Sequence, residues 1–167
     1  MKSMSYNIVL VEPEIPQNTG NIVRTCAATG TKLHLVKPLG FSVEDKYLKR
    51  AGLDYWQYVD IQYYDSFEEL REKYKDKKFY YVTTKGLNNY CDKQYQDESF
   101  FVFGKETKGL PEKLLYENRD DCIRIPMNEN LRSLNLANSV AIVLYEALRQ
   151  GNFNNMQTEG NLTSFEW

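Results

Sequence analysis

The sequence predicts an α/β fold in which helices cover both faces of a Rossmann-like parallel sheet. Helix-like segments lie between apolar runs, which gives a repeated β–α order. The runs are apolar at nearly every residue instead of alternating with polar ones, as expected for strands buried on both faces. The predicted strands occupy residues 7–11, 32–37, 58–64, 78–84, 99–104 and 122–126.

Helix-start signals follow two of these strands. Asn18 or Thr19 can cap a helix over residues 18–29, because short polar side chains accept hydrogen bonds from the free N–H groups of a first turn. Ser66 and Glu69 stand at the spacing of a capping box. Both signals favour a helix close behind its strand, as in a β–α unit.

The longest predicted helix spans residues 135–150 and ends before Gly151, which suits the position after a helix. Ile142 and Tyr145 widen its apolar stripe beyond one face. We therefore expect this helix to cover the sheet on one side, and a subunit interface is one candidate for the other side.

Composition points to a single domain in a reduced, cytoplasmic setting. The 167 residues suit one domain, placed at residues 1–151, with a polar tail at 152–167. The net charge of -2 gives no overall basic signal, so a nucleic-acid surface would have to be a local patch. The cysteines lack the spacing of a zinc or redox motif, and no apolar run is long enough to span a membrane.

Ligands of parallel α/β sheets bind beyond the carboxyl ends of the strands, so the loops there hold the functional candidates. The first loop, VEPEIPQNTGNIVR, combines Asn18 and Gly20 at a helix start with Arg24 about one turn later. Taken alone, it is equally compatible with an ordinary helix start followed by a solvated arginine.

The second loop, FGKETKGLP at residues 103–111, has Gly104 and Gly109 on either side of Glu106. It is not a Walker A loop, because no Lys and Ser or Thr follow its second glycine, and the chain contains no G-x-G-x-x-G. Common ATP and dinucleotide sites are therefore disfavoured. The residues alone also fit a glycine-rich turn before a helix with Pro111 at its first position.

The third loop, IPMNENLRSLNLANS at residues 125–139, places Arg132, Ser133 and Asn135 before the long helix. Capping accounts for one of these polar residues but not for the whole group. His34, the single histidine, lies between two leucines in a strand and is interpreted as a packed residue, not a catalytic base.

Together and in this order, the three loops resemble the three motifs of the SPOUT superfamily of S-adenosylmethionine-dependent RNA methyltransferases. The resemblance covers nearly the whole chain. Within the superfamily, NIVLVEPEIPQNTGNIVRTCAATG, LKRAGLDYW and TTKG are similar to the small, single-domain enzymes that methylate the 2′-oxygen of the tRNA wobble cytidine or uridine. The resemblance implies an α/β fold with a deep C-terminal trefoil knot, and a homodimer.

The same resemblance implies an S-adenosylmethionine pocket built from the end of the fourth strand and from the second and third loops. No metal is expected, because methyl transfer depends on positioning the methyl carbon in line between sulfur and the acceptor oxygen. The implied cofactor-binding residues are Val82, Thr83, Gly104, Gly109, Ile125, Met127, Ser133 and Leu134.

The implied catalytic set consists of Asn18, Arg24, Glu106, Ser133 and Asn135. Family mechanisms often assign the arginine as the base, but a guanidinium has no acceptor. We therefore expect Arg24 to pair with a phosphate and to stabilise negative charge that develops on the 2′-oxygen. The anticodon stem-loop of tRNA is the expected partner, and the residues expected to contact it are Arg24, Lys49, Arg50, Lys85, Arg132 and Tyr145.

Three alternatives remain open on the sequence. The first is the same chemistry on another tRNA or rRNA nucleotide, and the second is a non-catalytic RNA- or cofactor-binding module. The complete set of Arg24, Glu106 and Ser133 favours an enzyme over such a module. The third, a flavodoxin-like nucleotide-binding protein, lacks its phosphate loop here.

Overall fold

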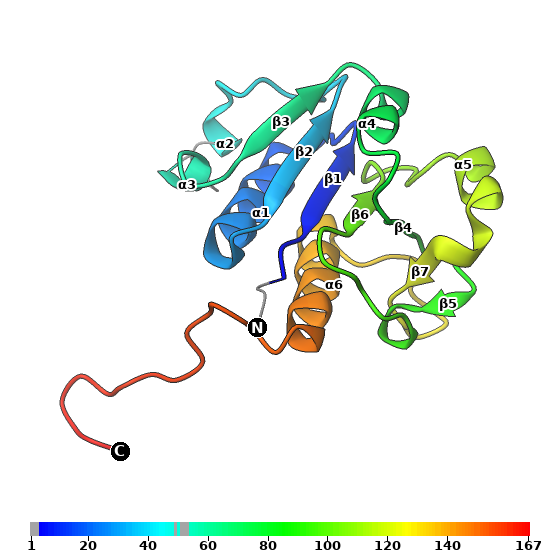
Figure 1. Cartoon of the computed structure of the whole chain (residues 1–167). Coiled ribbons are helices and arrows are strands. Elements are labelled where there is room, and N and C mark those ends of the chain that lie inside the picture. Colours follow the sequence, from blue (N-terminus) through cyan, green and yellow to red (C-terminus); the bar gives the residue numbers. More distant parts are fainter. Residues whose placement is uncertain (1–3, 49, 51–53) are drawn as a thin grey trace.

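A seven-stranded parallel sheet forms the centre of the computed structural model, which describes residues 4–48, 50 and 54–167 (Figure 1). The strand order is β3-β2-β1-β6-β4-β7-β5, and every strand pair is parallel. The strands are β1 (Asn7–Val11), β2 (Lys32–Val36), β3 (Ile61–Tyr64), β4 (Phe79–Val82), β5 (Asn88–Asn89), β6 (Phe100–Phe103) and β7 (Cys122–Arg124).

All six predicted strands are present. The first has the predicted bounds, and the other five are shorter than predicted. The largest shift of a single strand end is at β3, predicted from residue 58 but beginning at Ile61. Tyr58 and Val59 instead donate backbone hydrogen bonds to Tyr55 and Trp56, which closes a turn before the strand. The short strand β5 carries no apolar run and was not predicted.

Helices cover both faces of the sheet, as the sequence predicts (Figure 1). Residues of α1 and α6 pack in one buried cluster with Ile8 and Leu10 of β1, and residues of α4 and α5 pack in a second cluster with Val9 and Val11. The period of two along β1 therefore sends apolar side chains to both faces. The helices are α1 (Pro16–Thr29), α2 (Lys46–Leu48), α3 (Asp54–Trp56), α4 (Phe67–Lys73), α5 (Glu112–Glu117) and α6 (Leu136–Gln150), with 3₁₀ turns η2 (Tyr90–Asp92) and η3 (Arg119–Asp121).

The expected cap of α1 is wrong. The helix begins at Pro16 with Ile15 as its N-cap residue and has no side-chain cap. Asn18 and Thr19 lie inside the first turn and are buried. The carboxylate of Glu106, from a distant loop, instead accepts the N–H groups of Glu14 and Ile15 just before the helix. Pro111 likewise stands at the N-cap of α5 and not at its first helical position.

The other start signals are confirmed. The hydroxyl of Ser66 accepts the N–H of Glu69 at 3.1 Å, and the Glu69 carboxylate accepts the N–H of Asp65 at 2.9 Å. Asn135 caps α6, where its side-chain oxygen accepts the N–H of Asn138 at 3.2 Å.

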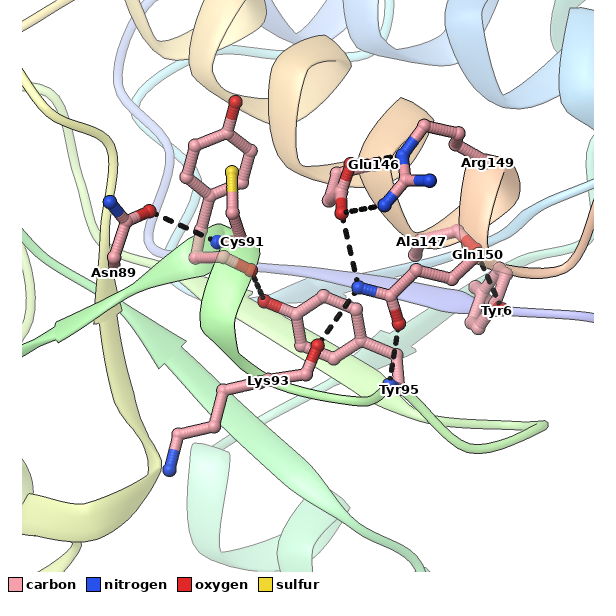
Figure 2. A network of polar contacts seen from close by, with 10 residues as sticks. Tyr6, Asn89, Cys91, Lys93, Tyr95, Glu146, Ala147, Arg149 and Gln150 are labelled. Carbon is pink, nitrogen blue, oxygen red and sulfur yellow. Dashed lines mark hydrogen bonds and ion pairs between the residues drawn. The ribbon is translucent and has the colours of Figure 1, made fainter.

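The last turns of α6 are bound to the segment between β5 and β6 (Figure 2). The side chain of Gln150 donates to the carbonyl of Lys93 at 2.8 Å and accepts the N–H of Tyr95 at 2.9 Å. On the core side, the hydroxyl of Tyr6 donates to the carbonyl of Ala147 at 3.0 Å. These bonds hold the end of α6, so the start of the helix lies at a defined place above the sheet.

The packed part of the chain reaches beyond the domain end expected at residue 151. Phe153 and Met156 still contact the core cluster, whereas residues 157–167 are exposed and lead away from the sheet (Figure 1). No helix in the described part of the chain is long and apolar enough to cross a membrane.

Candidate active site at the carboxyl ends of the central strands

A cavity of about 540 Å³ lies where β4, β6 and β7 end. The three loops singled out in the sequence all contribute to its wall. The cavity is lined by every residue that the family resemblance assigns to the cofactor, namely Val82, Thr83, Gly104, Gly109, Ile125, Met127, Ser133 and Leu134.

The loop after β6 is closed on itself and forms one wall of the cavity. The N–H of Gly109 donates to the carbonyl of Lys105 at 2.8 Å, and Gly109 has a φ of 68°, which favours glycine. A Cβ on Gly104 would lie 2.1 Å from the carbonyl carbon of Gly109. The close backbone approach that requires Gly104 is therefore between two parts of this loop.

One chain of hydrogen bonds joins the three loops. The carboxylate of Glu106 accepts the N–H groups of Glu14 at 2.8 Å and Ile15 at 3.1 Å, and the side-chain amide of Asn18 at 3.3 Å. The side-chain oxygen of Asn18 in turn accepts the amide of Asn135 at 3.0 Å. Since Glu106 bonds to three donors, its evident task is to position the start of α1.

Glu14 and Thr107 form a second bond between the first two loops. The backbone N–H and hydroxyl of Thr107 donate to the Glu14 carboxylate at 3.1 and 2.7 Å. These hydrogen bonds, together with the charges of Lys105 and Lys108, lower the pKa of Glu14. Sequence reasoning missed this pair, because no spacing rule relates residues on two loops.

Arg24 is not brought to the cavity of its own chain. Its side chain is exposed on α1, and its guanidinium carbon lies 5.0 Å from the centroid of the Tyr55 ring. Arg24 follows the cavity-lining Asn18 by six residues, which is roughly 9 Å along the helix and about a third of a turn away around its axis. The structure therefore gathers Asn18, Glu106, Ser133 and Asn135 but not Arg24.

The residues expected to contact RNA divide into two groups. Lys85 and the exposed Arg132 line the cavity, and the Lys85 ammonium pairs at 2.6 Å with the carboxylate of Glu112, which lies outside the lining. Arg50 and Tyr145 are exposed outside the cavity lining, with 42% of Tyr145 accessible on α6. Lys49 lies outside the described residues.

His34 is a packed residue, as expected. It is 1% exposed, one ring nitrogen lies 2.9 Å from the Tyr64 hydroxyl, and the other lies 2.9 Å from the Asn7 side-chain oxygen. Because an amide oxygen only accepts, the neutral ring donates to Asn7 and accepts from Tyr64. Burial lowers the pKa of His34 to about 4.

Comparison with known proteins agrees with this arrangement. Residues 5–145 match the model of the SpoU rRNA methylase family. A relative from Bacillus subtilis is 54% identical over 160 residues, covering 94% of this chain and 100% of the relative. A tRNA (cytidine(34)-2′-O)-methyltransferase from Methylovorus glucosotrophus is 51% identical over 149 residues, covering 89% of this chain and 97% of the relative.

Solved structures share the fold. One that concerns the 2-OH methylation of C/U34 on tRNA has a TM-score of 0.85 and 41% identity, covering 90% of this chain and 99% of that one. The methyltransferase AviRb of Streptomyces viridochromogenes, solved with AdoMet, has a TM-score of 0.80 at 22% identity, covering 92% of this chain and 63% of that one, and supports the fold alone. With the family model matched over most of the chain and the same sheet present, this chain belongs to the SpoU rRNA methylase family.

Proposed function

We propose that this chain is an S-adenosylmethionine-dependent tRNA methyltransferase that methylates the ribose 2′-oxygen of the wobble cytidine or uridine. The observation that carries the proposal is the single cavity in which all three sequence motifs meet. The choice of substrate is supported by the relative from Methylovorus and by the structure concerned with C/U34, because both are similar to this chain over nearly their whole length.

The cavity suits the proposed cofactor in size and chemistry. A volume of about 540 Å³ is within the range of small-molecule sites. Val82, Ile125 and Leu134 offer apolar contacts for an adenine ring, and the closed loop from Gly104 to Gly109 offers backbone polar groups. S-adenosylmethionine supplies a methyl group on a positively charged sulfur, so the transfer requires no metal.

The chain's own residues contribute mainly by positioning. Glu106, Asn18 and Asn135 fix the three loops relative to one another through their hydrogen bonds. A fixed wall holds the reacting atoms in line, and such orientation can supply a large part of an enzyme's rate enhancement. Ser133 is exposed and lines the same cavity, where its hydroxyl can contact cofactor or ribose.

We further propose that the active unit is a homodimer in which Arg24 of one copy completes the site of the other. Arg24 lies outside the cavity lining of its own chain, so a second copy is the simplest source of this cation. Helix α6 leaves Tyr145 exposed on the side away from the core, which suits a subunit contact. In that position the guanidinium stabilises developing charge on the 2′-oxygen and pairs with a phosphate.

The proposed partner is the anticodon stem-loop of tRNA, which places the reaction in the cytoplasm. Lys85 and Arg132 border the cavity and offer charge to phosphates near the target nucleotide. Arg50, which is exposed outside the cavity lining, is a further proposed contact with RNA, and so is Lys49, which lies outside the described residues. A two-fold dimer would present each of these groups twice, which enlarges the local positive surface although the overall charge stays acidic.

Mapping the product of total tRNA tests the function. The protein is incubated with total tRNA and S-adenosylmethionine labelled in its methyl group, and the labelled nucleotide is then located. A 2′-O-methyl group at the wobble position of cytidine or uridine supports the proposal. Label at another nucleotide keeps the chemistry and refutes the substrate, and absence of label with intact cofactor binding indicates a binding module.

Mixed dimers test the shared site. Arg24→Ala is combined with a second variant that has lost only cofactor binding, and each is inactive alone. If Arg24 acts on its partner's cavity, one site of each mixed dimer is intact, and random mixing restores about a quarter of wild-type activity. If Arg24 acts on its own cavity, every site keeps one defect and no activity returns.

A further inference from the structure

The Arg24 guanidinium lies over the ring of Tyr55. The two side chains come from α3 and α1, and the guanidinium carbon lies 5.0 Å from the ring centroid, within the range of a cation–π contact. Both residues are exposed, and 37% of Tyr55 is accessible. Neither the sequence motifs nor the comparisons assign a role to Tyr55.

The backbone segment that carries Tyr55 is anchored to the core. Its neighbour Trp56 and nearby Val59 pack against the buried cluster that also holds α1 and α6. Turn hydrogen bonds from Tyr58 to Tyr55 and from Val59 to Trp56, at 3.0 and 3.2 Å, close the backbone around α3. Tyr55 therefore stands at the surface on a segment that is held by the core.

A cation–π contact orients an arginine in a way that an ion pair does not. A guanidinium has five N–H donors, and an aromatic ring holds the cation without accepting the paired hydrogen bonds that a carboxylate would take from them. The ring carries no formal charge, so it does not neutralise the positive charge of the arginine. A carboxylate partner would occupy two of the donors and offset the charge.

We propose that Tyr55 is a positioning residue for the methyl transfer, which it serves by holding the Arg24 guanidinium with its donors directed toward RNA. This inference rests on the proposed function, in which Arg24 contacts a phosphate and the reacting ribose. Tyr55 acts through Arg24 and does not itself contact the reacting atoms.

The test compares Tyr55→Leu with Tyr55→Phe, which keeps the aromatic face and removes only the hydroxyl. Tyr55→Leu is expected to lower kcat/KM for tRNA by about two- to five-fold, the factor that corresponds to an exposed cation–π contact. Its affinity for S-adenosylmethionine should match that of the wild type, since the pair lies outside the cavity lining. Its thermal unfolding should shift only slightly, since both side chains are exposed. Tyr55→Phe should match the wild type in all three measurements.

Binding of tRNA to the Arg24→Ala variant separates positioning from direct contact. In that background Tyr55→Leu should not weaken tRNA binding further, because the arginine it orients is absent. The inference is overturned if Tyr55→Leu has wild-type kinetics, if Tyr55→Phe is as defective as Tyr55→Leu, or if the loss persists without Arg24. Failure of the proposed function gives a different pattern, in which the wild type transfers no methyl group to tRNA or Arg24→Ala is fully active.

Discussion

Replacing Gly104 by alanine tests whether the closed loop after β6 forms the wall of the site. The added Cβ would lie 2.1 Å from the carbonyl carbon of Gly109 and 2.3 Å from the backbone nitrogen of Leu110. Non-bonded carbon atoms normally approach to about 3.5–4.0 Å. Both obstructing atoms belong to the backbone, so no side-chain rotation can relieve the clash, and the loop must open.

Two other glycines supply matched controls. A Cβ on Gly109 meets nothing within 4 Å, but its φ of 68° is unfavourable for alanine and costs about 1–2 kcal/mol. A Cβ on Gly160, in the exposed tail, meets nothing within 4 Å. Overpacking typically costs about 1–3 kcal/mol, and we expect Gly104→Ala to reach or exceed the upper end because only backbone can move.

Urea unfolding and calorimetric titration with S-adenosylmethionine measure the two consequences. The free energy of unfolding should fall most for Gly104→Ala, less for Gly109→Ala, and not at all for Gly160→Ala. Cofactor affinity should be lost in Gly104→Ala, because the opened loop no longer follows the cavity. If Gly104→Ala unfolds and binds the cofactor as Gly160→Ala does, the closed loop is not the wall of the site.

Four further predictions follow from the site and the core. Arg24→Ala should lower kcat by about 100-fold or more, the loss seen when a group stabilising an oxyanion is removed, while cofactor affinity stays near the wild-type value; a large loss of affinity in titration would contradict the role given to this residue. Glu106→Ala should destabilise the fold by about 2–4 kcal/mol in urea unfolding, because three charge-assisted hydrogen bonds are lost; unchanged stability would show that these bonds are not formed in solution. Arg132→Ala should weaken tRNA binding and make its salt dependence shallower by about one phosphate contact, and equal slopes for variant and wild type would rule out that contact. Stability should fall as the pH drops from about 6.5 toward about 4, because His34 has its pKa lowered to about 4 in the folded state and the unfolded chain takes up the proton first. The expected loss in the free energy of unfolding is about 2 kcal/mol at pH 5. A His34→Gln variant whose stability has the same pH slope as the wild type would refute this assignment.

The sheet could be predicted from the sequence because its strands are buried on both faces. A strand such as β1, with all five residues buried, is an apolar run that hardly any other element resembles. Strand β5 has no such run. Its pairing is supported by the side chain of Asn88, which donates to the carbonyls of Asp120 and Cys122 at 3.3 and 3.1 Å. These contacts are made with residues more than 30 positions later in the sequence, so no local sequence pattern predicts them.

The cofactor cavity could be predicted from the family resemblance and not from apolar patterns. Residues such as Gly104 and Leu134 have no ligand spacing of their own, and they were identified through the family resemblance of the three loops together. The contacts that connect the loops and helices around the cavity could not be predicted in this way. Glu14 and Thr107 are 93 residues apart, and helical periodicity does not reveal that Arg24 faces Tyr55 instead of the cavity. The trefoil knot that the family resemblance implies is beyond pattern reasoning as well, because a knot is a property of the whole chain path.

Two synthetic anticodon stem-loops test the proposed function most directly. They share one sequence and differ only at the wobble nucleotide, which carries a ribose in one and a 2′-deoxyribose in the other. With labelled S-adenosylmethionine, the ribose form should receive one methyl group, and the deoxyribose form should bind with similar affinity but receive none. Equal methylation of the two stem-loops would contradict transfer to the wobble 2′-oxygen.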